Sequence, residues 1–61
     1  MEKKRYDVTG FIPHTSEIIE IVKCANHDMA LGAVADFHAI GADAVLYDNK
    51  NKAVEFFYCG K

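Results

Sequence analysis

Four side chains of this sequence could carry reactive chemistry: Cys24, His27, His38 and Cys59. Together they are the ligand types of a Cys₂His₂ zinc site. His27 and His38 are eleven residues apart in one predicted helix, which separates them by roughly 16 Å at 1.5 Å of rise per residue. One zinc ion lies about 2 Å from each nitrogen that binds it. We therefore expect no metal site and no cofactor.

Two other chemistries stay open at the cysteines. Cys24 and Cys59 would form a disulfide if the ends of their strands were adjacent, although free thiols are the rule in a reducing compartment. Cys24 and His27 are close enough to form a nucleophile–base pair, but such a pair also needs a group that orients the base, and a cleft. A domain with one helix offers no such cleft, so we expect a protein that is not an enzyme.

The elements that must position these residues follow a β-β-α-β-β order. β-Branched and aromatic residues predict four strands, at 5–12, 17–24, 43–48 and 52–59. Pro13 begins a turn after the first strand, and Asn49-Lys50-Asn51 forms a polar turn before the last, in which Asn tolerates positive φ. The order predicts a single α+β domain over residues 1–61, with a four-stranded, largely antiparallel sheet and one helix packed on one face.

The helix is expected over residues 27–40. Asn26 suits the N-cap, Asp28 places negative charge in the first turn, and Gly41 supplies the left-handed residue that ends the helix. One apolar stripe at helical spacing should face the core. It consists of Ala30, Ala33, Val34, Phe37 and Ile40.

Charge is unevenly distributed along the chain, whose net charge is −2. Residues 15–48 contain Lys23 as their only Lys or Arg, against six acidic residues. A nucleic-acid-binding protein usually shows a basic patch or stripe. Direct, nonspecific binding to nucleic acid is therefore disfavoured, whereas docking onto a basic groove of another protein is allowed.

Neither a transmembrane helix nor a signal peptide is predicted. The sequence has no apolar run of 18 residues, and no apolar stretch follows the charges at its start. We expect a cytoplasmic protein that does not bind a membrane.

The helix face opposite the core stripe is unusual. Exposed helix positions normally carry Lys, Glu, Gln or Arg, but small and acidic residues dominate here, and Gly32 in a helix interior costs ~1 kcal/mol relative to Ala. One explanation is a poorly optimised surface. The other is a binding site, since small residues let a partner approach the backbone closely. On that explanation the protein-binding residues are Asp28, Leu31, Gly32, Ala35, Asp36, His38 and Ala39.

The last predicted strand presents aromatic side chains to both faces of the sheet. Phe56 and Tyr58 alternate with Phe57. Because one helix covers one face only, either Phe57 or else Phe56 and Tyr58 should be exposed. This surplus indicates docking of a partner or a homodimer, and Phe57 is added to the predicted protein-binding residues.

Length, element order and a set of scattered residues point to a family. These residues are Met1-Glu2, Gly10-Phe11, Ser16, Asp28, Ala42, Tyr47, Lys52, Glu55 and Cys59-Gly60. In these features the chain resembles the Dmd family of small phage antitoxins, which neutralise host ribonuclease toxins of the RnlA and LsoA type. The resemblance covers essentially the whole chain. It implies a non-enzymatic inhibitor that occupies the substrate groove of a bacterial ribonuclease toxin, in the cytoplasm of the host cell.

Two positions depart from the family pattern. Leu31 stands where the family has a large aromatic residue in the helix, and Ile40 stands where it has a polar residue at the helix end. Toxin contacts through these positions would be altered. Two alternatives to the antitoxin hypothesis remain: a small phage inhibitor of another host enzyme, such as RNA polymerase or a defence nuclease, and a self-associating structural subunit.

The absence of an export signal leads to a prediction for the cysteines. Cys24 and Cys59 should both react with a maleimide in denatured, freshly lysed protein, because a reducing compartment keeps thiols free. The measurement is the mass added per chain, with a fully reduced sample as control. Labelling that requires prior reduction would instead reveal a disulfide.

Overall fold

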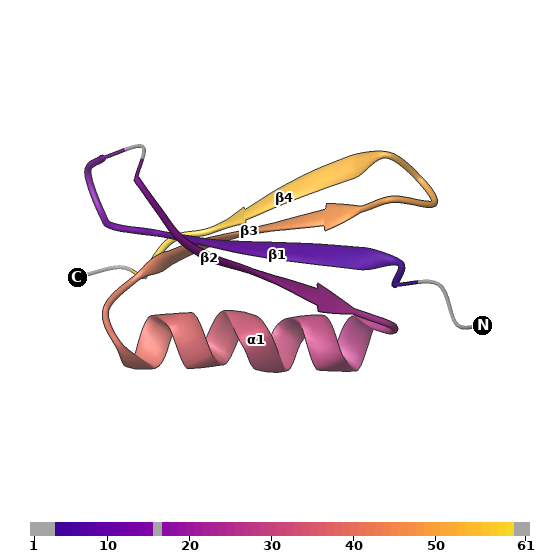
Figure 1. Cartoon of the computed structure of the whole chain (residues 1–61), viewed down its shortest axis with the longest axis horizontal. Coiled ribbons are helices and arrows are strands. Elements are labelled where there is room, and N and C mark those ends of the chain that lie inside the picture. Colours follow the sequence, from indigo (N-terminus) through magenta and orange to yellow (C-terminus); the bar gives the residue numbers. More distant parts are fainter. Residues whose placement is uncertain (1–3, 16, 60–61) are drawn as a thin grey trace.

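Four strands and one helix make up this structure, a computed structural model that describes residues 4–15 and 17–59. In chain order they are β1 (Tyr6–Phe11), β2 (Ile18–Cys24), α1 (His27–Ala39), β3 (Asp43–Asp48) and β4 (Ala53–Phe57). The strands form one antiparallel sheet in the order β2-β1-β3-β4, and the helix lies along one face of that sheet (Figure 1). The predicted α+β architecture is confirmed.

The register of the sheet decides which side chains meet the helix. Residues opposite each other in an antiparallel pair point to the same face. Val8 of β1 lies opposite both Val22 of β2 and Leu46 of β3, and all three belong to the core or pack against it. Their neighbours along each strand alternate to the other face. The helix packs on β1, β2 and β3, and its main contacts do not include β4.

The helix begins at His27 as predicted and ends at Ala39, one residue before the predicted end at Ile40, and the predicted residues cap it. The Asn26 side chain accepts a hydrogen bond of 2.9 Å from the backbone N–H of Met29, which satisfies one of the free donors of the first turn. At the other end Gly41 has a φ of 80°, and its N–H donates to the carbonyl of His38. The N–H of Ala42 donates to the carbonyl of Phe37, which completes a Schellman motif.

Four of the five residues predicted for the core stripe of the helix are buried, namely Ala30, Ala33, Val34 and Phe37. The prediction was wrong for Ile40, which is 69% exposed. Ile40 is the C-cap, with φ −100° and ψ 11°. Its backbone has already left the helix, so the helical period no longer sets the direction of its side chain.

The helix and the sheet approach each other closely at Gly10. A Cβ atom added to Gly10 would lie 2.3 Å from Cε1 of Phe37, which is far inside van der Waals contact. The ring of Phe37 therefore occupies the space that a side chain on β1 would need. Glycine is required at this position because no side chain fits beside Phe37. Backbone conformation is not the reason, since the φ of Gly10 is not positive.

The remaining differences from the predicted elements are at their ends. Three strands are shorter than expected. The first lacks Arg5 and Ile12, and the second lacks Glu17. The fourth lacks Lys52, Tyr58 and Cys59. The third strand matches its prediction. In the β3–β4 turn, positive φ falls on Lys52 (54°) and not on an Asn. The predicted turn after β1 includes Ser16, which lies outside the described residues.

Two glycines in this structure give opposite predictions for the same substitution. Gly10→Ala should lower the free energy of unfolding by about 2–3 kcal/mol, because the new methyl group displaces Phe37 from a packed core. Gly32→Ala is the matched control: nothing lies within 4 Å of its added Cβ, so better helix propensity should stabilise the protein by ~1 kcal/mol. Urea denaturation measures both. Equal stability of the Gly10→Ala variant and the unchanged protein would contradict the packing described here.

Candidate protein-interaction surfaces

The exposed side of α1 is acidic and carries mostly short side chains. Its residues, hereafter the helix back, are Asp28, Leu31, Gly32, Ala35, Asp36 and Ala39, and all six are exposed. The helix contains no Lys or Arg. Leu31, the bulkiest member, is 40% exposed, and a Cβ on Gly32 would meet only open space. Six of the eight predicted protein-binding residues therefore lie together on one accessible face.

The other two predicted residues, His38 and Phe57, are not part of that face. Nε2 of His38 lies 3.1 Å from the carbonyl oxygen of Phe57, and the Phe57 side chain packs half-buried against the core. Nearby, the N–H of Cys59 donates to Oδ1 of Asp43 at 2.8 Å. These contacts fasten the end of β4 to the helix and to β3. We call the contacts among His38, Asp43, Phe57 and Cys59 the clasp.

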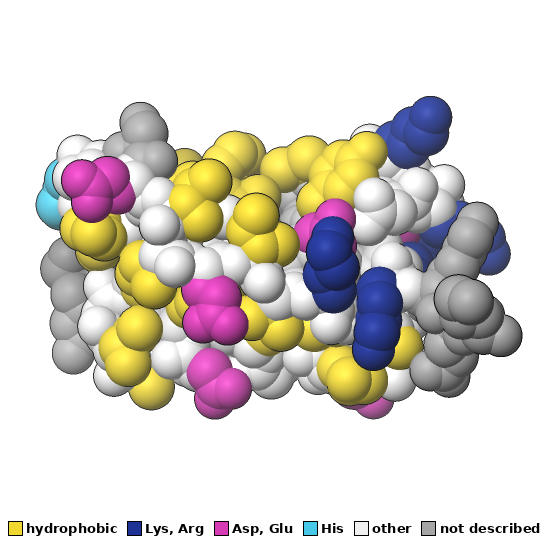
Figure 2. All heavy atoms as spheres, in the orientation of Figure 1, with side chains coloured by type: hydrophobic (Ala, Val, Ile, Leu, Met, Phe, Trp, Pro, Cys, Tyr) yellow, Lys and Arg dark blue, Asp and Glu magenta, His cyan; other side chains and the backbone are white. Residues whose placement is uncertain are grey.

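The sheet face away from the helix is largely apolar. The register places Asp7, Thr9, Phe11, Lys23 and Asp43 on it beside five further apolar residues of β2, β3 and β4. Those five, together with Tyr58 just beyond β4, are hereafter the open sheet face: Ile21, Val45, Tyr47, Val54, Phe56 and Tyr58. Phe56 and Tyr58 are 59% and 70% exposed, and their rings stack with centroids 6.0 Å apart. Hydrophobic side chains gather along the side of the molecule opposite the helix (Figure 2). The sequence left open whether Phe57, or else Phe56 and Tyr58, would be exposed. In the structure Phe56 and Tyr58 are exposed, and Phe57 faces the helix side.

Sequence reasoning missed Ile21 and Val54 as surface candidates. Ile21 is 51% and Val54 52% exposed. The signal that could have found Ile21 is the apolar character of both alternating positions in the second strand, since only one face of a two-layer domain is covered.

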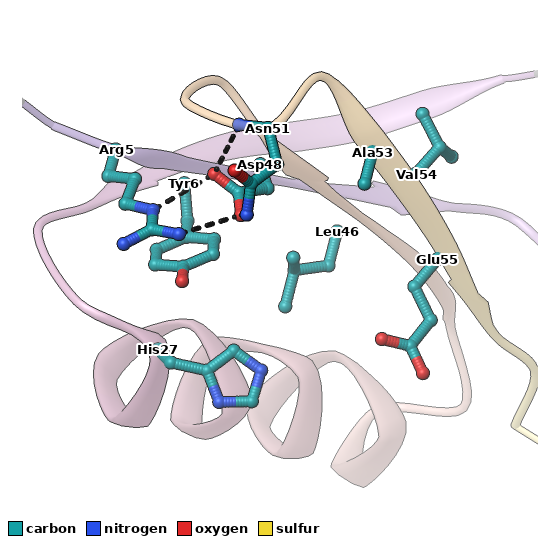
Figure 3. A pocket seen from close by; sticks show the side chains of 9 residues that line it. All are labelled: Arg5, Tyr6, His27, Leu46, Asp48, Asn51, Ala53, Val54 and Glu55. Carbon is teal, nitrogen blue, oxygen red and sulfur yellow. Dashed lines mark hydrogen bonds and ion pairs between the residues drawn. The ribbon is translucent and has the colours of Figure 1, made fainter.

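A hollow of about 390 Å³ opens on the helix side of the sheet, between the start of α1 and β4 (Figure 3). His27 lines it from the helix, and the Glu55 side chain extends into it from β4. The ring of His27 meets the ring of Tyr6 edge to face, with centroids 5.6 Å apart. The hollow exists because the helix does not cover β4.

An ion pair closes one end of this hollow. Nε and Nη2 of Arg5 donate to Oδ1 and Oδ2 of Asp48, both at 3.0 Å, a bidentate arrangement. Oδ1 also accepts from the N–H of Lys50 at 3.0 Å, and Oδ2 accepts from the side-chain amide of Asn51 at 3.1 Å. The guanidinium lowers the pKa of Asp48 to about 2. With both oxygens already accepting hydrogen bonds, the carboxylate joins β3, the turn and the chain before β1 and does not act as a base.

The two cysteines lie at opposite ends of the sheet. Cys24 is paired with Tyr6, which lies opposite Asp48 at the last position of β3. Cys59 follows Phe57, whose partner Ala44 is near the first position of β3. Both thiols are free. Burial raises the pKa of the Cys24 thiol, which makes it a poor nucleophile.

Within residues 4–15 and 17–59, no three His, Cys, Asp or Glu side chains are arranged to hold a metal ion. Nor does this described part of the chain contain a helix long and apolar enough to cross a membrane. Comparison with protein-family models, curated proteins and solved structures found no match. Function is therefore inferred from the surfaces themselves.

The lowered pKa of Asp48 predicts how stability depends on pH. A carboxylate whose pKa is lower in the folded protein stabilises it above the unfolded pKa, near 4, and loses that contribution as pH falls toward about 2. Asp48→Asn should therefore lower the melting temperature at pH 7, and the difference should shrink between about pH 4 and pH 2. Thermal melts followed by circular dichroism measure this.

Arg5→Met provides the control for that experiment. Because Arg5 and Asp48 act as a pair, the double variant should lose little more stability at pH 7 than either single variant. A melting-temperature difference for Asp48→Asn that stays constant from pH 7 to pH 2 would show that the pair does not account for the loss.

Proposed function

We propose that this protein is a non-enzymatic antitoxin, which binds a bacterial ribonuclease toxin of the RnlA/LsoA type in the host-cell cytoplasm and blocks its RNA-binding groove with the helix back. The observation that carries the proposal is the composition of that face. It presents two carboxylates, from Asp28 and Asp36, and the helix holds no Lys or Arg. A groove that binds RNA is basic, because it must neutralise phosphates. An acidic helix therefore competes with RNA for the same charges.

The shape of the helix back supports the same function. Thirteen residues of helix extend over roughly 20 Å at 1.5 Å per residue. Gly32 and Ala35 leave the backbone uncovered at the middle of this length, so the helix can enter a groove narrower than one that admits long side chains. Leu31 supplies an exposed apolar anchor, and a buried aliphatic or aromatic anchor is typical of a helix that binds in a groove.

The two departures from the Dmd family pattern fall on exposed positions. Leu31 lies on the helix back, and Ile40 follows at the end of the helix with 69% of its surface exposed. Both are apolar where the resemblance implies an aromatic and a polar residue. Their exposure supports a role in selecting among toxins, with a preference for a groove that is less polar at the helix end.

The rival hypothesis of a self-associating subunit is favoured by a different observation, the open sheet face. That face does not overlap the helix back, because the two lie on opposite layers of the domain (Figure 1). Self-association and toxin binding are thus compatible, and the open sheet face is considered separately below.

Substitutions on the helix back test the proposed function. Ala35→Arg and Gly32→Glu should abolish inhibition of the toxin ribonuclease, because each new side chain holds two closely packed surfaces apart. The Arg also places a positive charge against a basic groove. At exposed positions of the free protein the same changes should alter the free energy of unfolding by no more than about 0.5 kcal/mol, and Gly32→Glu should stabilise the helix. Purified toxin, an RNA substrate and thermal melts provide both measurements.

Ala53→Arg is the matched control, because it makes the same change at an exposed position on β4, away from the helix back. It should inhibit the toxin as the unchanged protein does. Full inhibition by both helix variants would exclude the helix back from the interface. Loss of inhibition together with loss of the melting transition would show that these positions belong to the core.

A further inference from the structure

The open sheet face has no role in the proposed toxin complex, yet it carries several exposed apolar side chains. Ile21, Val54, Phe56 and Tyr58 each expose more than half of their surface. Contiguous apolar area of this kind usually marks an interface. They lie on or next to β2 and β4, the two edge strands, and Thr9 of β1 and Val45 of β3 lie between Ile21 and Phe56 across the sheet.

We propose that the open sheet face packs against the same face of a second copy of this chain. The distribution of charge favours a second copy over a partner of different chemistry. The middle row across the sheet runs Ile21, Thr9, Val45 and Phe56, and contains no charged side chain. Among the residues that the structure describes, the charged side chains that the register places on this face lie toward the ends of the strands, and they already have partners: Nζ of Lys23 lies 3.4 Å from Oδ1 of Asp7, and Asp43 accepts from the backbone of Cys59.

A face with an uncharged centre and internally paired charges can meet itself without repulsion. This is the composition of a subunit interface, in which charged residues are depleted from the core of the contact and polar residues form the rim. The helix back has the opposite property. The helix has no Lys or Arg to balance its carboxylates, so two copies would repel each other there. The two faces are therefore suited to different partners.

The geometry of the sheet allows a closed, two-fold dimer. Two sheets pack face to face about 10 Å apart, with their strands rotated by about 30°. A two-fold axis parallel to the strands, passing between β1 and β3, would place β2 of each copy over β4 of the other. Ile21 would then meet Phe56 of the other copy. The contact is isologous and cannot propagate into a filament.

The area available is sufficient for a specific dimer. The four most exposed side chains of the open sheet face offer on the order of 500 Å² of apolar surface per copy. Two copies would then bury about 1,000 Å², the size at which specific interfaces begin. A single copy also has a small core, which a second copy would enlarge: Val8 is the only large side chain among the described residues that is fully buried. A chain of 61 residues buries only about 60% of the surface of its unfolded form, and a second sheet adds a second core.

Sedimentation equilibrium of the unchanged protein is the first test. Between about 5 µM and about 500 µM the average mass should rise from near 6.8 kDa toward twice that value, as it does for a dimer at the small end of specific interfaces with a dissociation constant in the micromolar range. The melting temperature should rise over the same concentrations. A mass of 6.8 kDa throughout would overturn the proposal, whatever the variants do.

Two substitutions locate the contact. Phe56→Glu and Ile21→Glu should each weaken dimerisation at least about 100-fold, because each places an unpaired carboxylate in both halves of the interface. Ile40→Glu is the control, since it makes the same kind of change at an exposed position on the helix side, and it should leave the dimer constant unchanged. Unaltered dimerisation by both sheet variants would move the contact away from this face. A monomeric protein in which Phe56→Glu loses toxin binding would assign the face to the toxin instead.

Discussion

Everything in this domain depends on how closely the helix can approach the sheet, and Gly10 sets that distance. The Phe37 ring fills the space that a side chain at Gly10 would take. Because the ring lies directly on the β1 backbone, the smaller residues of the same stripe, Ala30 and Ala33, also reach the sheet and become buried. A larger residue at Gly10 would lift the helix away from all of them. The small size of the core follows from the same contact.

One helix on a four-stranded sheet leaves two kinds of surface uncovered. The helix packs mainly on β1, β2 and β3, so β4 is held by its pairing with β3, by the clasp at one end and by the turn at the other. The opposite face of the sheet has no cover within the described chain, and its apolar residues stay exposed. Acidic and small residues on the helix, and apolar residues on the sheet, then form two separate surfaces of different chemistry.

Much of the fold could be predicted from the sequence, because its signals are local. The N-cap at Asn26, the stop at Gly41 and the spacing of Phe37 with the smaller apolar residues before it each depend on a few neighbouring positions. Prediction was wrong where a local period ceased to apply, as at Ile40, the first residue beyond the helix. It left open which aromatic residues of β4 face the helix, since both alternating sets are apolar and only the register decides.

The candidate surfaces were predictable in part for the same reason. The helix back follows from helical spacing, and six of its predicted residues are exposed together. His38 was assigned to it because it lies at the edge of that face, but its contact with Phe57 comes from a residue 19 positions away. The pair of Arg5 and Asp48, 43 positions apart, has no local signal at all. Contacts of this kind become visible only when the strand order is known.

The placement of the two surfaces on opposite layers has a consequence for valency. If two copies join through their open sheet faces, the helices lie on the two outer sides of the assembly and face away from each other. Such a dimer offers two equivalent binding sites that one target molecule does not block together. Against a target that is itself dimeric or locally concentrated, the second binding event becomes intramolecular, and avidity exceeds the affinity of a single helix. A protein of 61 residues would in this way obtain tight binding from a short helix.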